Sequence, residues 1–65
     1  MSNICRVHWT CTVELEDGYT PEELALQAAE TARAITPEAI HVLTVELPEG
    51  GLWRVDLTTR RARPA

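Results

Sequence analysis

Apolar and polar residues alternate along the first part of the chain, between Asn3 and Leu15. A period of two is typical of a strand with one buried face, so the pattern predicts one strand over about 3–15. The Asp17-Gly18 pair is a turn signal that follows this strand. The side chains expected on its buried face all occupy odd positions: Cys5, Val7, Trp9, Cys11, Val13 and Leu15.

The residues after this turn predict a helix over about 21–35. Thr20 is a helix-capping residue, Pro21 suits the first helical position, and Glu23 completes a capping box. The helix body is rich in Ala, Leu, Glu and Gln, which favour the helical state. Pro37 ends it, because the residue before a proline avoids helical angles. The expected apolar stripe is Leu24, Ala28, Ala32 and Ile35, widened by Thr31.

Two further alternating segments predict strands over about 40–47 and 52–59. The odd positions of both are apolar, so the loop between them must hold an odd number of residues to keep these positions on one face. A three-residue loop over 48–50 meets this condition, since proline opens a turn and glycine adopts left-handed angles. This register places Val45 opposite Trp53.

These elements predict one small α+β domain over 1–59, in the order β-α-β-β, with a three-stranded sheet and one helix packed on one face. The chain has 65 residues, which suffice for one domain with a thin core. The first strand lies either parallel to the second, through a right-handed crossover, or antiparallel to the third. At about 43 Å it would outreach the others, so it either bends at a bulge or leaves an unpaired edge.

Composition narrows the classes of function. The chain carries 10 acidic and 6 basic residues, a net charge of −4, which argues against general nucleic-acid binding. The apolar runs are too short for a membrane helix, and residues 1–20 lack the pattern of a signal peptide, so we expect a cytoplasmic protein. Three of the six basic residues lie after the last predicted strand, where 60–65 is expected to form a flexible basic tail. Its arginines, Arg60, Arg61 and Arg63, offer a contact for an anionic partner.

Cys5, His8 and Cys11 have a spacing that suggests a metal site at first sight. On a straight strand, however, His8 points to the face opposite the cysteines, which lie about 20 Å apart and out of disulfide reach. We therefore expect reduced thiols, and neither a metal site nor a bound cofactor. The histidines, carboxylates and glycines form no pattern of a catalytic group or a phosphate-binding loop, so we expect no enzyme.

Two resemblances extend this interpretation. The chain resembles small β-α-β-β proteins of GC-rich actinobacteria and their phages in Thr20-Pro21-Glu22-Glu23 with its Ala-rich helix and in Trp53-Arg54-Val55-Asp56-Leu57. That group implies no particular function. The element order is also similar to that of dodecins, which are oligomeric flavin-binding proteins. A dodecin has a flavin-stacking aromatic on the second strand, where this chain has Val and Ile.

The most suggestive feature is the sheet face that the helix leaves open. We expect an apolar centre with polar surroundings there, which is typical of an interaction surface. The leading hypothesis is a non-enzymatic module that forms a homo-oligomer and docks a protein partner through this face or a strand edge. The alternatives are an oligomeric flavin-type carrier and a phage-type inhibitor of a host protein. The expected partner-binding residues are Ile4, Arg6, His8, Ile40, Val42, Leu52 and Arg54.

Overall fold

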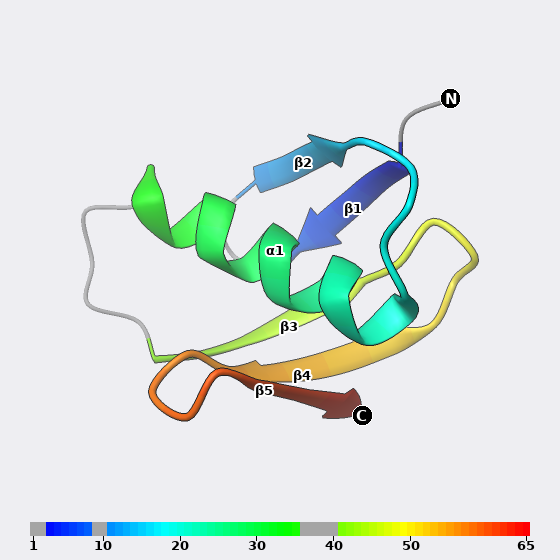
Figure 1. The fold of residues 1–65 in the computed structure, drawn as a ribbon. Helices are drawn as coiled ribbons and strands as arrows, with labels where there is room; N and C mark the ends of the chain where they lie inside the picture. The colour runs from blue at the N-terminus through cyan, green and yellow to red at the C-terminus, as the bar shows by residue number, and fades with distance from the viewer. Residues whose placement is uncertain (1–2, 9–10, 36–40) are drawn as a thin grey trace.

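The computed structural model describes residues 3–8, 11–35 and 41–65. In Figure 1, one helix lies across one face of a sheet, so the molecule has two layers. The α+β class and the helix on one face are confirmed, but the sheet has five strands rather than three. The elements are β1 (Asn3–Val7), β2 (Cys11–Leu15), α1 (Pro21–Ala34), β3 (Val42–Glu46), β4 (Leu52–Asp56) and β5 (Arg61–Pro64).

The prediction of one long strand over 3–15 is wrong. The chain reverses after β1, and β2 pairs with it antiparallel, with Val7 opposite Cys11. The longest extent of the Cα trace is 31 Å, which a straight strand of about 43 Å would exceed. Three residues separate the paired positions, so the odd positions of both strands still share one face. Trp9, expected in the core, lies outside the described residues.

All neighbouring strands are antiparallel, in the order β2-β1-β3-β4-β5. Of the two predicted positions of the first strand, the one beside the second predicted strand has the correct neighbour, but β1 pairs with β3 antiparallel instead of parallel. The His8 amide extends this pairing by donating to the Thr44 carbonyl at 2.9 Å. Since β2 and β3 are both antiparallel to β1, they run parallel to each other with β1 between them. Helix α1 therefore connects a split β-α-β unit.

The hairpin of β3 and β4 confirms the predicted loop and register. Val45 lies opposite Trp53, and the Leu47 amide donates to the Gly51 carbonyl at 2.8 Å. These pairs leave the three residues 48–50 as the loop. Gly50 has a φ of 95°, in the left-handed region where glycine meets no steric penalty.

The predicted flexible tail is a strand. Residues 61–64 form β5, which pairs with β4 after a four-residue turn over 57–60. The Asp56 carboxylate Oδ1 organises this turn by accepting from the amides of Thr58 at 2.9 Å and Thr59 at 3.3 Å. An even loop length reverses the alternation. Ala62 therefore packs against the core beside Val55, while Arg61 and Arg63 share the opposite face of the sheet.

The core lies between α1 and the sheet, and α1 contacts all five strands. The helix buries Leu24 together with four alanines, so the backbone can approach the sheet closely. The predicted stripe is correct at positions 24, 28 and 32, but it is widened by Ala25 and Ala29. Thr31 is exposed and Ile35, at the helix C-cap, is 68% exposed. The largest fully buried side chains are valines and Cys5, which makes a thin core.

The helix begins with the predicted capping box. The Glu23 amide donates to Thr20 Oγ1 at 3.2 Å, and the Thr20 amide donates to Glu23 Oε1 at 3.0 Å. The hydrogen bond from the Thr20 backbone amide, together with the Thr20 side chain, lowers the pKa of Glu23 below its ordinary value of 4.5. The carboxylate form of Glu23 is therefore the one that stabilises the helix start.

We expect this cap to make stability depend on acid pH. The folded-state pKa of Glu23 is lowered, so its contribution is present above pH 4.5 and is lost as pH falls through the folded pKa. The variant Glu23→Gln should show a smaller loss of unfolding free energy than the parent chain over this acid range. Urea denaturation followed by circular dichroism at several pH values measures it. Glu22→Gln is the control, and an equal change in both variants would contradict the assignment.

Removal of residues 61–65 should destabilise the fold, because it deletes a strand rather than a tail. The truncation exposes Val55 and removes the β4–β5 hydrogen bonds, including that from Ala65 to Leu52. At about 0.5–1 kcal/mol net for each bond, we expect a loss of about 2 kcal/mol or more in unfolding free energy. The control, Arg61→Gln with Arg63→Gln, keeps the strand and should not lose stability. A truncated chain as stable as the parent would show that β5 contributes nothing.

Candidate functional site: the open face of the sheet

The face of the sheet opposite α1 is called the open face below. The alternation of each strand assigns its side chains, with even positions on β1 to β4 and odd positions on β5. All five strands therefore contribute to it. Its side chains are Ile4, Arg6, Thr12, Glu14, Val42, Thr44, Glu46, Leu52, Arg54, Asp56, Arg61 and Arg63.

The apolar side chains of the open face are exposed but dispersed. Ile4, Val42 and Leu52 are 56%, 50% and 47% exposed. The strand pairings set three rows across the face: Arg6–Glu46–Leu52, Thr44–Arg54–Arg63 and Val42–Asp56–Arg61. The middle row is polar and separates Leu52 from Val42. The expected apolar centre is therefore wrong, because Thr44 and Arg54 occupy that position.

Three arginines gather at the β5 side of the open face. They line a hollow of about 280 Å³ whose walls are Val42, Arg54, Asp56, Thr59, Arg61 and Arg63. Arg54 lies directly opposite Arg63. The Ala65 amide donates to Leu52, so the pairs two residues further along each strand, Arg54 with Arg63 included, are hydrogen-bonded ones with Cα atoms about 5.5 Å apart. Two like charges in this position repel each other.

The hollow contains one carboxylate, which offsets only part of the arginine charge. Asp56 lies across the ladder from Arg61, and its Oδ1 accepts from two turn amides. Within the described part of the chain, no carboxylate lies at ion-pair distance from Arg54, Arg61 or Arg63. The hollow therefore holds three cationic groups against one anionic group, in a chain whose net charge is −4.

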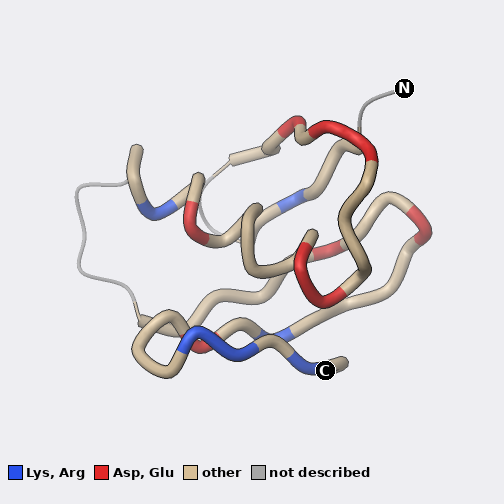
Figure 2. Tube along the Cα trace, in the orientation of Figure 1, with Lys and Arg blue, Asp and Glu red and all other residues tan. Residues whose placement is uncertain are grey.

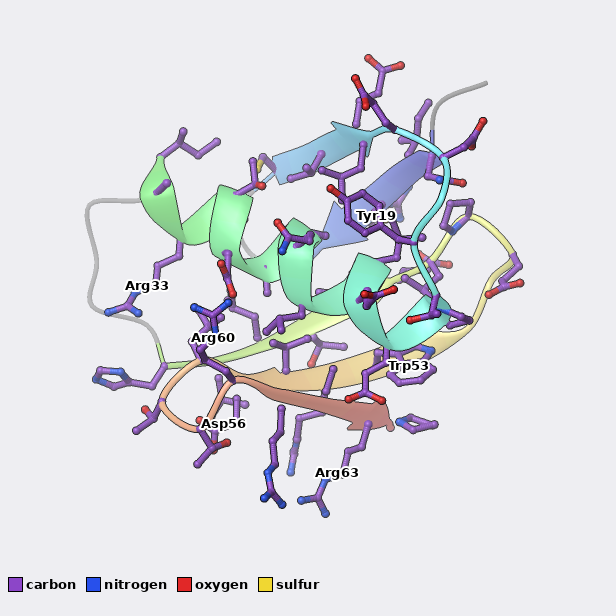
Figure 3. All side chains as sticks on the ribbon, viewed as in Figure 1. Tyr19, Arg33, Trp53, Asp56, Arg60 and Arg63 are labelled. Carbon is purple, nitrogen blue, oxygen red and sulfur yellow. The ribbon has the colours of Figure 1, made fainter. Side chains whose placement is uncertain are left out.

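Arg60 does not belong to this cluster, so the three arginines of the predicted tail do not act together. Figure 3 shows the Arg60 side chain beside the helix, whereas Arg63 points away from it. Arg60 Nη2 lies 2.9 Å from Glu30 Oε1, close enough for a strong charge contact although its direction is poor for a hydrogen bond. Arg60 has a φ of 56°, a strained value for a residue with a side chain. Its ion pair with the helix supports this conformation.

Charge is unevenly distributed over the molecule. In Figure 2 basic positions are concentrated along the β4–β5 turn and β5, with others on β1, β4 and near the end of α1. Acidic segments lie in the loop before α1, at the helix start and in the β3–β4 turn. Arg6 on the open face is balanced by Glu46, whose Oε1 lies 4.0 Å from Arg6 Nη1. The arginine hollow is thus a local basic site on an acidic protein. The acidic side chains at the other end include Glu16, Asp17, Glu22, Glu23 and Glu49.

The other predicted site residues have less defined positions. His8 is exposed just beyond β1, where its backbone pairs with β3, and Ile40 lies outside the described residues. His41 is exposed, and its carbonyl accepts from the Leu57 amide at 2.7 Å. Trp53 is half-buried on the helix side (Figure 3). Among the described aromatic residues, none lies on the open face.

The two cysteines are closer than a straight strand would place them. In the hairpin Cys5 lies opposite Val13, so Cys11 is its diagonal neighbour, about 7–8 Å away between Cα atoms. The predicted separation of about 20 Å is therefore wrong, although both thiols are free. Burial raises the pKa of Cys5, which keeps that thiol protonated and unreactive. Among the described residues, no cluster of three or more His, Cys, Asp or Glu side chains could hold a metal ion.

Alternation along the last predicted strand already places Asp56 on the open face, but sequence patterning missed Thr59 as a wall of the hollow and separated Arg61 and Arg63 from Arg54. The signals were present but weak. An Asp followed two and three residues later by Thr58 and Thr59 is a pattern of side-chain-stabilised turns. The alternation of Arg61, Ala62 and Arg63 fits a strand, yet four residues ending in proline are too short to predict one.

No protein-family model matches the chain, and neither a curated protein nor a solved structure matches it. The β-α-β-β order behind the likeness to dodecins is not the order of the structure, which is β-β-α-β-β-β. The helix of the described residues is too short and too polar to cross a membrane.

The repulsion between Arg54 and Arg63 predicts that a site residue can be replaced with a gain in stability. Arg63→Glu converts a like-charge pair into an ion pair, and we expect it to raise the unfolding free energy by about 0.5 kcal/mol at low salt. Arg63→Gln should give a smaller gain, because it removes the repulsion only. Urea denaturation at low and high salt checks both variants. If Arg63→Glu is no more stable than Arg63→Gln, the two side chains do not interact.

Proposed function

We propose that this protein is a non-enzymatic binding module that docks a protein partner on its open face and also self-associates. The observation that carries the proposal is the two-layer fold itself. One helix covers one face of a five-stranded sheet. The other face presents exposed aliphatic or cationic side chains in each of the three rows across it. A surface of this kind, with aliphatic residues and several arginines, is typical of non-obligate protein–protein interfaces.

The chemistry of the hollows supports binding rather than catalysis. The hollow on the open face combines guanidinium groups with one carboxylate that is engaged in a turn. Guanidinium groups stay charged and bind anions, but they do not exchange protons near neutral pH. Cys5, the described thiol with a perturbed pKa, is fully buried on the other side of the sheet.

Self-association is supported by the size of the core. Among the described residues, the largest fully buried side chains are valines and Cys5, and no Trp or Tyr is buried. A domain of 65 residues buries only about 60% of the surface of its unfolded chain, so its stability is marginal. A second copy that covers exposed Val42 and Leu52 would remove further apolar surface from water.

We expect light scattering coupled to size exclusion to detect a dimer or larger species that grows with protein concentration. Val42→Gln should weaken this association, since Val42 lies on the open face. Ile35→Gln is the matched control, because it removes an exposed aliphatic residue at the helix end. Amide NMR spectra at low and high concentration should shift on β3 to β5 and not on the exposed side of α1. A monomer at every concentration would contradict self-association and leave partner docking to be tested separately.

A further inference from the structure

The arginine hollow carries a cost that the fold does not need. Arg54 and Arg63 face each other across the β4–β5 ladder, and no carboxylate among the described residues is paired with either one. By contrast, Arg6 and Arg60 each have an acidic partner within 4.0 Å. A carboxylate at position 63 would relieve the repulsion, so the uncompensated charge points to a ligand outside the chain.

The geometry of the cluster suits a ligand with spaced negative charges. Arg61 and Arg63 are alternate residues of one strand, so their Cα atoms lie about 6.6–6.8 Å apart along β5. Carboxylates at alternate positions of an extended peptide have the same spacing. Arg54 stands across the ladder from Arg63 and supplies a third guanidinium for bidentate contacts.

The outer edge of β5 is poorly suited to adding another strand. The hydrogen bond from Ala65 to Leu52 directs the backbone groups of Arg61 and Arg63 toward β4, so those of Ala62 and Pro64 point outward. Proline has no amide hydrogen, and one outward amide remains on this strand. A ligand segment is therefore expected to lie over the open face and not to extend the sheet.

We propose, resting on the proposed docking function, that the hollow lined by Arg54, Arg61 and Arg63 binds an acidic, extended segment of a protein partner, with carboxylates at alternate positions. Val42 in the wall of the hollow gives an aliphatic contact for the intervening residues, and Leu52 gives a second one, two residues before Arg54 on β4. Nucleic acid fits less well, because no described Trp or Tyr side chain on the open face is available for base stacking.

The test measures binding of a fluorescein-labelled peptide, Glu-Val-Glu-Thr-Glu-Val-Glu, by fluorescence anisotropy. We expect salt-sensitive binding that is lost when Gln replaces every Glu of the peptide. Arg63→Gln should weaken binding about three- to fivefold, and Arg54→Gln with Arg63→Gln about tenfold or more, since exposed ion pairs contribute modestly. Arg33→Gln is the matched control, because it removes an exposed arginine from the last turn of α1 and should leave binding unchanged.

A charge swap separates a binding role from a structural one. Arg63→Glu should lose affinity for the Glu peptide while remaining folded, and it should gain affinity for the same peptide with Lys in place of Glu. Tighter binding of single-stranded DNA of equal charge than of the Glu peptide would overturn the acidic-segment assignment. So would an equal loss of affinity in Arg33→Gln and Arg63→Gln. If the chain binds the peptide but light scattering shows a monomer, this inference is supported and self-association is rejected. If the chain self-associates but does not bind the peptide, only the proposed ligand of the hollow is rejected.

Discussion

The burial of one sheet face under the alanine-lined side of α1 is the constraint on which the other features depend. Four alanines on the helix let its backbone approach all five strands. Every strand must therefore place its apolar set on that side, and its alternate residues then face away. The open face and its arginines are the complement of this packing, since the strand residues that alternate with the core residues face away from the helix.

Loop length decides which positions belong to each face. Three residues separate Val7 from Cys11 and three separate Leu47 from Gly51, so odd positions remain on the helix side from β1 through β4. The turn over 57–60 holds four, and the buried set changes to even positions on β5. If that turn had three residues, Arg61 and Arg63 would point into the helix layer. The arginine hollow thus depends on the turn that Asp56 organises, because the four-residue length of this turn places Arg61 and Arg63 on the open face.

The odd or even length of each loop also explains which parts of the fold can be predicted from the sequence. Positions with strong local chemistry, such as the Thr20–Glu23 cap and the 48–50 loop, are predicted with their hydrogen bonds and register. The β1–β2 reversal is hidden, because an odd loop leaves the alternation unchanged and residues 8–10 contain no glycine, proline, asparagine or aspartate. Length was its one signal, since a straight strand would exceed the globule. Likewise, the site residues Arg54, Arg61 and Arg63 are all predicted, but their convergence requires the strand pairing.

Stability and binding then make opposite demands on the open face. A thin core would gain from every favourable cross-strand pair, and Arg6 with Glu46 and Arg60 with Glu30 follow that rule. Arg54 with Arg63 departs from it at a position where a carboxylate is sterically free to stand. Local departures from otherwise consistent design rules are expected at functional positions. Arg54 and Arg63 are the like-charge pair of the described ladder, so an external anion bound between them would relieve their repulsion.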